Sequence, residues 1–337
     1  MKSLQKFSIH KRYVYLSLTI ILILLAVLSV SLGAVSISFK EILTLISGGD
    51  IKTSHRSIIL YTRIPRTIAC VLVGSALSVS GVIIQSVLDN PLSAPNIIGV
   101  NSGAGFFVLL SSAIFPTMVY LRPIFAFLGA LTAVFTVLLI SEKSGSSKLT
   151  LILTGVAVSG IFTAGTDFII SVDSDASSGY TDFKIGSFSG ISMKNLYLPI
   201  VVIVLCLVIS LLLTNELDVL SLGHDTAFSL GLDAKKMRNI FLIISSALAA
   251  SAVAVSGVIG FVGLLVPHAL RRLVGSEAKP LIISSILGGA SLTLGADLIS
   301  RLLFAPNELP VGILLSLIGG IFFILLLLKQ RKGRIHD

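Results

Sequence analysis

Charged residues are scarce in this sequence. Aspartate, glutamate, lysine and arginine together make up 12% of the 337 residues, whereas hydrophobic residues make up 54%. A soluble domain carries about 25% charged residues, so a chain of this length with half that proportion lacks the polar groups to cover its apolar surface. The mean hydropathy of +1.02 agrees with this. The composition excludes a soluble globular protein and predicts one that lies mostly in lipid.

Cysteine is rare and tryptophan is missing altogether. The two cysteines, Cys70 and Cys206, lie far apart within apolar segments. This placement excludes a disulfide framework or a cysteine-based zinc site, and it is typical of small hydrophobic residues in helices. Without tryptophan, any aromatic belt at the membrane boundaries has to use tyrosine and phenylalanine.

Several catalytic motifs are also missing from the sequence. There is no G-x-x-x-x-G-K-[ST] loop, so the chain cannot hydrolyse ATP by that route. There is no nucleophile elbow and no H-E-x-x-H helix either. We therefore predict a protein that is not an enzyme. If it transports a substrate, the energy has to come from a partner or from an ion gradient.

Long apolar runs fill most of the chain. A membrane-spanning helix needs about 20 mostly apolar residues, and the candidates lie near 14–34, 66–88, 96–115, 122–141, 149–171, 196–214, 238–256, 258–273, 281–301 and 309–328. The run 258–273 is short and contains Pro267, which predicts a broken or partial span. The fold class is therefore an all-α polytopic membrane protein, with about ten transmembrane helices in a single domain over residues 1–337.

The basic residues predict the orientation of these helices. With ten spans the two termini lie on the same side, and the segments on that side hold 16 of the 25 lysines and arginines. Because cytoplasmic segments are enriched in basic residues, we predict that both termini are cytoplasmic. The net charge of +9 is then a signal of topology. No basic stripe with interleaved aromatic residues indicates binding of nucleic acid.

Several arginines fall on the predicted outer side, against this trend, and three of them are candidates for a function. Arg63 and Arg66 stand at the start of the second span, and Arg301 closes the ninth. One interpretation is that they reach lipid phosphate. The other is a basic outer rim that docks an acidic partner, because arginine pairs bidentately with carboxylates.

Two acids, Asp167 and Asp297, fall within predicted spans. An acid inside the membrane is a candidate for function, and a secondary transporter driven by a proton or sodium gradient would use one. Asp297 stands one helical turn before Arg301, so an ion pair between the two is the alternative.

The segment from Ser221 to Leu232, on the predicted cytoplasmic side, has the pattern of a short helix. Asp225 or Thr226 is a candidate cap for its start, and Gly231 for its end. Its apolar residues stand in a loop that water should surround. This predicts either a contact surface for a partner or a helix that lies on the membrane.

Five segments of the chain together resemble the membrane subunits of ABC importers for iron–siderophore complexes, haem and cobalamin. They follow the order of that family over almost the whole chain, and they are Arg63-Ile-Pro-Arg66, Gly81 to Gly105 with its Asp-Asn-Pro-Leu, Leu222 to Gly231, Gly260 to Gly275, and Ala296 to Arg301 followed by Glu308-Leu-Pro-Val-Gly312.

The resemblance implies a type II importer permease in a bacterial cytoplasmic membrane. Two such subunits, identical or different, would line one pathway. Two ATP-binding subunits, which use ATP and magnesium, would lie on the cytoplasmic side, and a periplasmic or lipid-anchored substrate-binding protein on the other. The chain itself would bind no cofactor and no metal. Its implied cargo is an iron–siderophore complex, with haem or cobalamin as alternatives.

The resemblance also implies roles for particular residues. Arg63, Arg66 and Arg301 would contact carboxylates of the binding protein. The coupling helix for the ATPase would comprise Leu222, Gly223, Asp225, Ala227, Leu230 and Gly231. Small residues of the second span, Gly74, Ser75, Ser78 and Gly81, would form part of the wall of the path. Close helix packing is the alternative for these small residues.

Overall fold

The computed structural model describes residues 2–145, 147–173, 175–305 and 307–333, and this part of the chain contains helices and no strand. Seven of its helices are long and apolar enough to cross a membrane. They are α1 (Lys2–Ser31), α4 (Ile64–Leu88), α6 (Arg122–Lys143), α7 (Lys148–Val172), α9 (Met193–Leu212), α12 (Ala234–Ser256) and α14 (Ala278–Leu303).

Three further helices coincide with the remaining predicted spans, namely α5 (Val100–Ile114), α13 (Val262–Val274) and α15 (Val311–Gly333). Every predicted span therefore overlaps a helix, which confirms the all-α membrane fold, although the number of full crossings is approximate. The shorter elements are α2 (Phe39–Ile46), α3 (Thr53–Ile58), η1 (Ile59–Arg63), η2 (Pro95–Ile98), η3 (Val119–Leu121), α8 (Ser177–Ile185), α10 (Thr214–Ser221) and α11 (His224–Ser229).

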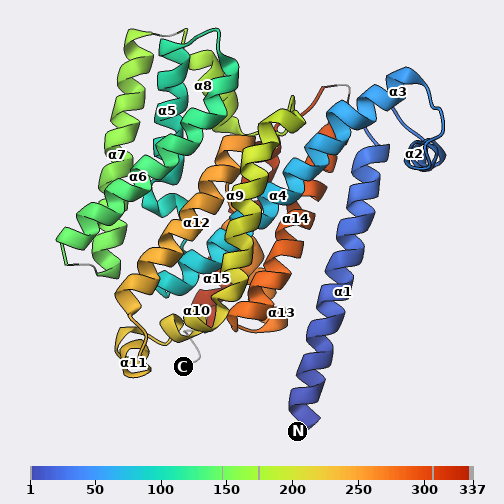
Figure 1. The fold of residues 1–337 in the computed structure, drawn as a ribbon. Coiled ribbons are helices and arrows are strands. Elements are labelled where there is room, and N and C mark those ends of the chain that lie inside the picture. Colours follow the sequence, from blue (N-terminus) through green and yellow to red (C-terminus); the bar gives the residue numbers. More distant parts are fainter. Residues whose placement is uncertain (1, 146, 174, 306, 334–337) are drawn as a thin grey trace.

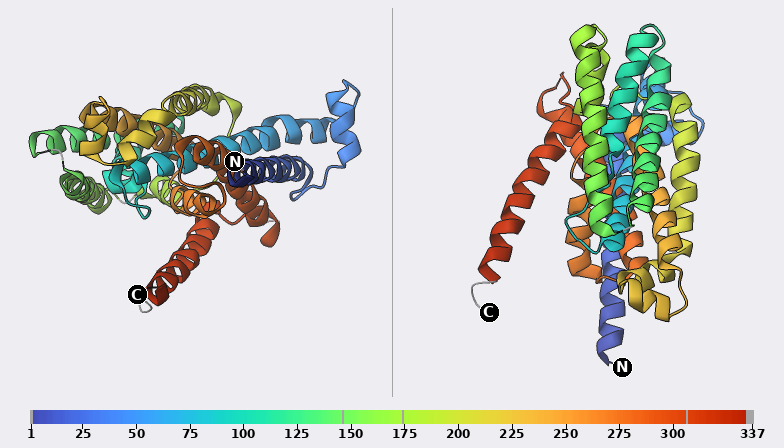
Figure 2. Two further views of the ribbon diagram at one scale, coloured as in Figure 1. Left: turned by 90° about the horizontal axis from the view of Figure 1, so that it is seen from below. Right: turned by 90° about the vertical axis from the view of Figure 1, so that its left-hand side faces the viewer.

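Helix α4 forms the centre of the bundle (Figure 1). It packs against α12, α13 and α14, and most of its residues are buried. Its glycine, alanine and serine residues let neighbouring helix backbones approach closely, which suits this central position. Helix α15 leaves the bundle at an angle, as Figure 2 shows, so much of its apolar surface stays uncovered.

The bundle has two ends, which we name as Figure 1 draws them. The upper end carries α2, α3 and α8, and the lower end carries α10 and α11. Helix α1 begins and α15 ends at the lower end (Figure 1). The connections α6–α7 and α13–α14 also lie there, so the basic residues that the sequence places on one side share this end.

The eighth predicted span is a short helix, α13, which runs through Pro267 without a break, and the irregular backbone lies just before it. Helix α12 ends at Ser256, residues 257–261 are not helical, and Pro267 lies inside α13. Gly257 ends α12 with φ of 69°, a conformation that glycine adopts without strain. The amide of Val258 then donates to the carbonyl oxygen of Phe183 over 2.9 Å. Protein groups thus satisfy the irregular backbone, as a membrane requires.

Helix α2 is held to α3 by Glu41. The side chain of Ser38 accepts a hydrogen bond from the Glu41 amide over 3.3 Å, and a Glu41 carboxylate oxygen accepts from the Ser38 amide over 3.1 Å. This reciprocal pair is a capping box. The other carboxylate oxygen of Glu41 lies 2.8 Å from Nδ1 of His55. One carboxylate therefore both starts α2 and attaches it to α3.

We expect α2 to loosen in acid. The hydrogen bonds from His55 and Ser38 lower the pKa of Glu41 below its ordinary value of 4.5. A carboxylate with a lowered pKa stabilises the folded state above its unfolded pKa, and this contribution is lost as the pH falls through the folded pKa. Amide exchange in α2, corrected for the intrinsic rate, should therefore accelerate below pH 4.5. Glu41→Gln should exchange fast already at neutral pH; an identical acid response in both proteins would contradict this role.

Candidate docking and coupling sites

A cluster of buried charges joins α4 to α14 near the upper end. Arg66 Nη2 lies 2.9 Å from Asp297 Oδ1, and Arg66 Nε donates to the same carboxylate over 3.0 Å. Arg301 Nε lies 3.1 Å from Asp297 Oδ2. The pairing of Asp297 with Arg301 that the sequence predicts is confirmed. The ion pair between Asp297 and Arg66 was not predicted from the sequence.

The charges in this cluster are almost balanced. Asp297 is completely buried between two guanidinium groups, where an unpaired charge would be very costly. Glu308 adds a second carboxylate, 2.7 Å from Arg66 Nη1, and its side chain is 41% exposed. With Arg63 nearby, three positive charges face two negative ones, so this cluster keeps one positive charge in excess.

Arg63 and Arg301 also fasten α1 to the bundle. Arg63 Nη1 donates to the carbonyl oxygens of Val30 and Ser31 over 2.6 and 2.7 Å. Its Nη2 donates to the carbonyl oxygen of Val35. Arg301 Nη2 donates to the hydroxyl of Ser29 over 2.9 Å. The last carbonyls of a helix have no partner within the helix, so these arginines complete the end of α1.

The three arginines are less exposed than the sequence predicts. Arg63, Arg66 and Arg301 are 5%, 6% and 5% exposed, so they do not form an exposed rim. Their partners in α1 and α14 draw them inward. All three nevertheless line one small cavity of about 150 Å³ at the upper end, together with Glu308 and Thr62. The structure thus brings the predicted docking residues together around a cavity, and docking itself stays a prediction.

The predicted coupling helix lies at the lower end. It is α11, which begins at His224, and Gly223 precedes it with φ of 100°. The prediction of a cap at Asp225 or Thr226 is wrong, because the chain already turns at Gly223, which only glycine does easily. Gly231 follows the helix with φ of 80° and donates to the carbonyl oxygen of Phe228 over 2.9 Å, so the predicted end is confirmed.

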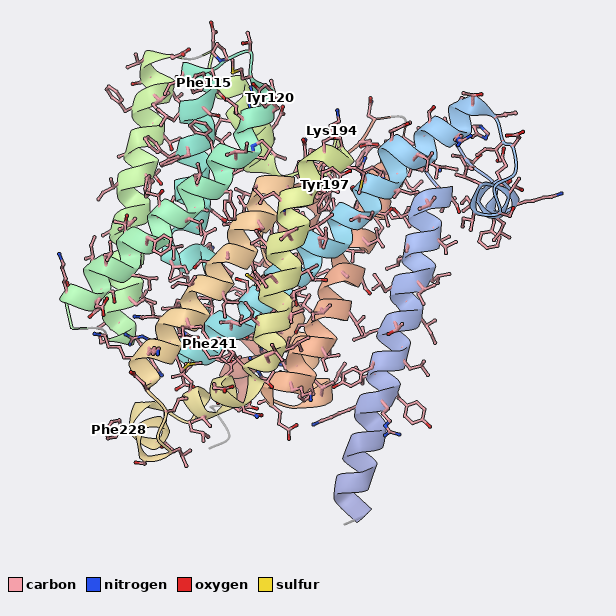
Figure 3. All side chains as sticks on the ribbon, viewed as in Figure 1. Phe115, Tyr120, Lys194, Tyr197, Phe228 and Phe241 are labelled. Atoms are coloured by element: carbon pink, nitrogen blue, oxygen red, sulfur yellow. The ribbon has the colours of Figure 1, made fainter. Side chains whose placement is uncertain are left out.

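The side chains of this segment divide into two sets. Ala227 is fully buried, whereas Leu222, Phe228 and Leu230 are all more than 60% exposed. Phe228 points away from the bundle (Figure 3). The side chain of Asp225 lies outside the described part of the structure. Of the segment Gly260 to Gly275, the C-terminal part reaches this same end, where α13 stops at Val274.

The small residues of α4 lie at helix contacts. A Cβ atom on Gly74 would come within 2.1 Å of the Thr293 hydroxyl oxygen, and one on Gly81 within 1.8 Å of the Gly263 carbonyl oxygen. Ser75 donates to the carbonyl oxygen of Ile286 over 3.0 Å, and Ser78 is fully buried. This conformation supports helix packing for these residues, and their place on a path stays a prediction.

Titratable side chains gather in few other places. Among the residues that the structure describes, no group of three or more histidine, cysteine, aspartate or glutamate side chains could hold a metal ion. The bundle of apolar helices, the buried charges between them and the exposed apolar loop define the class of protein. It is a polytopic membrane protein.

Known proteins resemble the chain along almost its full length. Residues 21–329 match the FecCD transport family, and the chain belongs to that family. It is 35% identical to the hemin transport system permease protein HmuU of Yersinia pestis, over 94% of this chain and 96% of that protein. It is 37% identical to the Fe(3+)-citrate import system permease protein YfmE of Bacillus subtilis, over 93% of each chain.

A solved structure shares the fold. It is an inward-facing conformation of a metal-chelate type ABC transporter, with a TM-score of 0.85 and 32% sequence identity, over 94% of this chain and 99% of that one. The chain is thus a permease subunit of the ABC transporter class, located in the cytoplasmic membrane. Permeases of this class are not themselves enzymes, and they work with ATPase and substrate-binding partners.

Proposed function

We propose that this chain forms the path of an ATP-driven importer for an iron–siderophore complex. The observation that carries the proposal is similarity along the whole chain to permeases named for ferric citrate, ferric hydroxamate and ferric enterobactin. Haem is the alternative cargo, because a hemin permease is equally similar. Cobalamin is the third candidate cargo. In this proposal ATP and magnesium are used by the partner ATPase, which agrees with the lack of a phosphate-binding loop in this sequence.

The proposed orientation places the lower end in the cytoplasm and the upper end outside, with both termini cytoplasmic. The basic residues at the helix ends that border the α6–α7 and α13–α14 connections, and those in the first turns of α12, support it. A second permease subunit, identical or different, would complete the path, together with two ATP-binding subunits. The uncovered apolar surfaces of α7 and α15 leave room for such a neighbour.

Docking of the binding protein is proposed at the cavity that the three arginines line. A carboxylate of the partner would enter this cavity, where the excess positive charge attracts it. Loss of the arginines is a poor test, because they are buried and paired. Thr62 is exposed, lies at the cavity and makes a better site for a variant.

Thr62→Glu should weaken the affinity for the binding protein, because its carboxylate would occupy the positive cavity. We expect a loss of about tenfold, the factor for one charge-assisted hydrogen bond. In Thr62→Gln the glutamine has nearly the shape of the glutamate but no charge, so this variant should bind the partner almost as the wild type does. Surface plasmon resonance on the reconstituted permease measures both. Equal affinity of the two variants would contradict docking at this cavity.

Coupling to the ATPase is proposed through α11 and the residues that flank it. Phe228 is 74% exposed in this segment, and an exposed aromatic side chain at an interface contributes about 2 kcal/mol or more when a partner buries it. Phe228→Ala should therefore weaken binding of the ATPase at least about tenfold. Phe115→Ala, at the upper end (Figure 3), is the control and should leave it unchanged. An effect of the same size in both variants would contradict the assignment.

In the mechanism that follows, the chain changes conformation and makes or breaks no covalent bond. ATP binding closes the ATPase pair, α11 transmits that movement, and the bundle exchanges outward-open and inward-open states. The competing secondary transporter would need a carboxylate that is free to take up a proton or sodium ion. Asp297 is bound by two arginines in this structure, which does not favour that role.

The cargo can be tested through the neighbouring subunits. The complex is purified with its binding protein, and that protein is titrated with ferric siderophores, haem and cobalamin. Binding of a ferric chelate alone supports the proposed cargo. Binding of haem or cobalamin alone would replace it, and no binding of any of the three would overturn the cargo assignment.

A further inference from the structure

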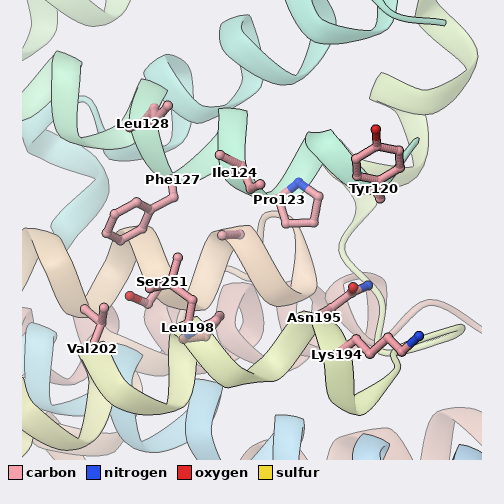
Figure 4. A pocket seen from close by; sticks show the side chains of 12 residues that line it. Tyr120, Pro123, Ile124, Phe127, Leu128, Lys194, Asn195, Leu198, Val202 and Ser251 are labelled. Carbon is pink, nitrogen blue, oxygen red and sulfur yellow. The ribbon is translucent and has the colours of Figure 1, made fainter. Parts of the chain in front are cut away.

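An apolar groove lies between α6 and α9, with α12 as its floor (Figure 4). We call it the α6–α9 groove. Its volume is about 350 Å³, and the residues used here are Phe127 and Leu128 of α6, Leu198 and Val202 of α9, and Ser251 of α12. None of these residues belongs to the docking cavity, the coupling helix or the buried charges described above.

The groove opens toward the lipid. Leu128 and Leu198 line it and are about half exposed. Exposed apolar side chains of this kind are typical of the surface of a membrane protein that lipid covers. Figure 2 shows α9 on the face of the bundle opposite α15. The surface that faces the proposed second subunit is therefore a different one.

The polar groups at the mouth of the groove lie at the upper end. Lys194 and Tyr120 belong to its lining, and Figure 3 shows both toward that end, with Phe115 beside Tyr120 and Tyr197 below Lys194. Tyrosine and phenylalanine with lysine are typical of the boundary where lipid headgroups lie. In Figure 4 the groove runs from Tyr120 and Lys194 past Ser251 to Val202.

Ser251 has an unsatisfied hydroxyl inside this apolar groove. The residue is 1% exposed, and its oxygen has no hydrogen-bond partner. A buried hydroxyl without a partner is unfavourable, and in hydrocarbon no water supplies one. A molecule that fills the groove would have to be apolar along most of its length and carry an acceptor near Ser251. Close to Lys194, it would have to carry an anionic group.

We propose that the α6–α9 groove binds one anionic phospholipid. The phosphate would pair with Lys194 and accept from the Tyr120 hydroxyl, the ester carbonyl would accept from Ser251, and an acyl chain would lie along Phe127 and Val202. Lys194 and Val202 are eight residues apart on one helix, so the groove is roughly 12 Å long.

The absence of tryptophan from the sequence allows a direct test. Phe127→Trp places a single fluorophore in the groove, and Leu205→Trp places one on the exposed surface of α9 outside it. Each full-length variant is reconstituted without partners in phosphatidylcholine that contains increasing fractions of brominated phosphatidylglycerol, and a parallel sample with the ATPase partner serves the folding control. Bromine quenches tryptophan on contact, so the quenching reports which lipid occupies the site.

We expect Phe127→Trp to reach half-maximal quenching at about a tenfold lower fraction of brominated phosphatidylglycerol than Leu205→Trp, the factor for one charge-assisted hydrogen bond. Adding Lys194→Gln to Phe127→Trp should abolish the difference, and brominated phosphatidylcholine should quench both variants alike. Identical curves for the two reporters, or a preference that survives Lys194→Gln, would overturn the proposal. Unchanged ATPase stimulation in every variant confirms that the protein is folded.

Discussion

Replacing Asp297 with asparagine should destabilise the protein by about 3–5 kcal/mol, the range measured when one partner of a buried ion pair is removed. The carboxylate of Asp297 is completely buried and contacts both Arg66 and Arg301. Without it, two almost fully buried guanidinium groups lie close together with no carboxylate between them. Asparagine keeps the shape and some hydrogen bonds but does not compensate either charge.

The measurement is reversible unfolding of the purified permease in mixed micelles with rising denaturant. Glu308→Gln is the matched control, because Glu308 also pairs with Arg66 but is 41% exposed. Exposed or half-exposed pairs contribute about 0–1 kcal/mol, so this variant should unfold almost as the wild type does. A free energy of unfolding for Asp297→Asn within 1 kcal/mol of the control would show that the cluster does not hold α4 and α14 together.

Gly81→Ala should be almost as damaging, although it adds only one methyl group. The new Cβ would lie 1.8 Å from the carbonyl oxygen of Gly263, so the backbones of α4 and α13 would have to separate. Overpacking of a core costs about 1–3 kcal/mol and occasionally more. We expect about 3 kcal/mol here, because neither atom belongs to a side chain that can rotate away.

Gly160→Ala is the control for this substitution. Gly160 lies in the middle of α7, and a Cβ there would meet no atom within 4 Å. Alanine is also a better helix former than glycine, so the stability of the Gly160→Ala variant should stay the same or rise slightly. Thermal aggregation of both variants, followed by size-exclusion chromatography, makes the comparison. If both variants lose the same amount of stability, the tight contact between α4 and α13 is not what Gly81 provides.

The helices were predictable because each one has to be apolar over its own length. Hydropathy over a window needs only local sequence, and the pairing of Asp297 with Arg301 needs only a separation of four residues. The bidentate contact of Arg66 with Asp297 joins residues 231 positions apart. The single hydrogen bond from Arg66 to Glu308 joins residues 242 positions apart. No local pattern contains this information. One signal was present, since ionised groups within apolar spans need partners of opposite charge.

The same reasoning explains what the sequence did not indicate. The exposure of Arg63 depends on the carbonyl oxygens of α1 that it meets, and those lie about thirty positions earlier in the chain. The short length of the eighth span and its Pro267 predicted a broken or partial span, but α13 continues through that proline. The irregular backbone lies at Gly257 instead, where the end of α8 supplies a backbone partner. The α6–α9 groove combines three helices and has no signature in any one of them.

The central claim is that this chain is a passive path moved by partners. Uptake of a radiolabelled ferric siderophore into proteoliposomes tests it most directly. The chain is reconstituted alone or with its ATPase and binding protein, with ATP inside, and a second set contains an ionophore. We predict no uptake by the chain alone, ATP-dependent uptake by the complex, and no effect of the ionophore. Uptake by the chain alone that the ionophore abolishes would contradict the account and identify an ion-coupled transporter.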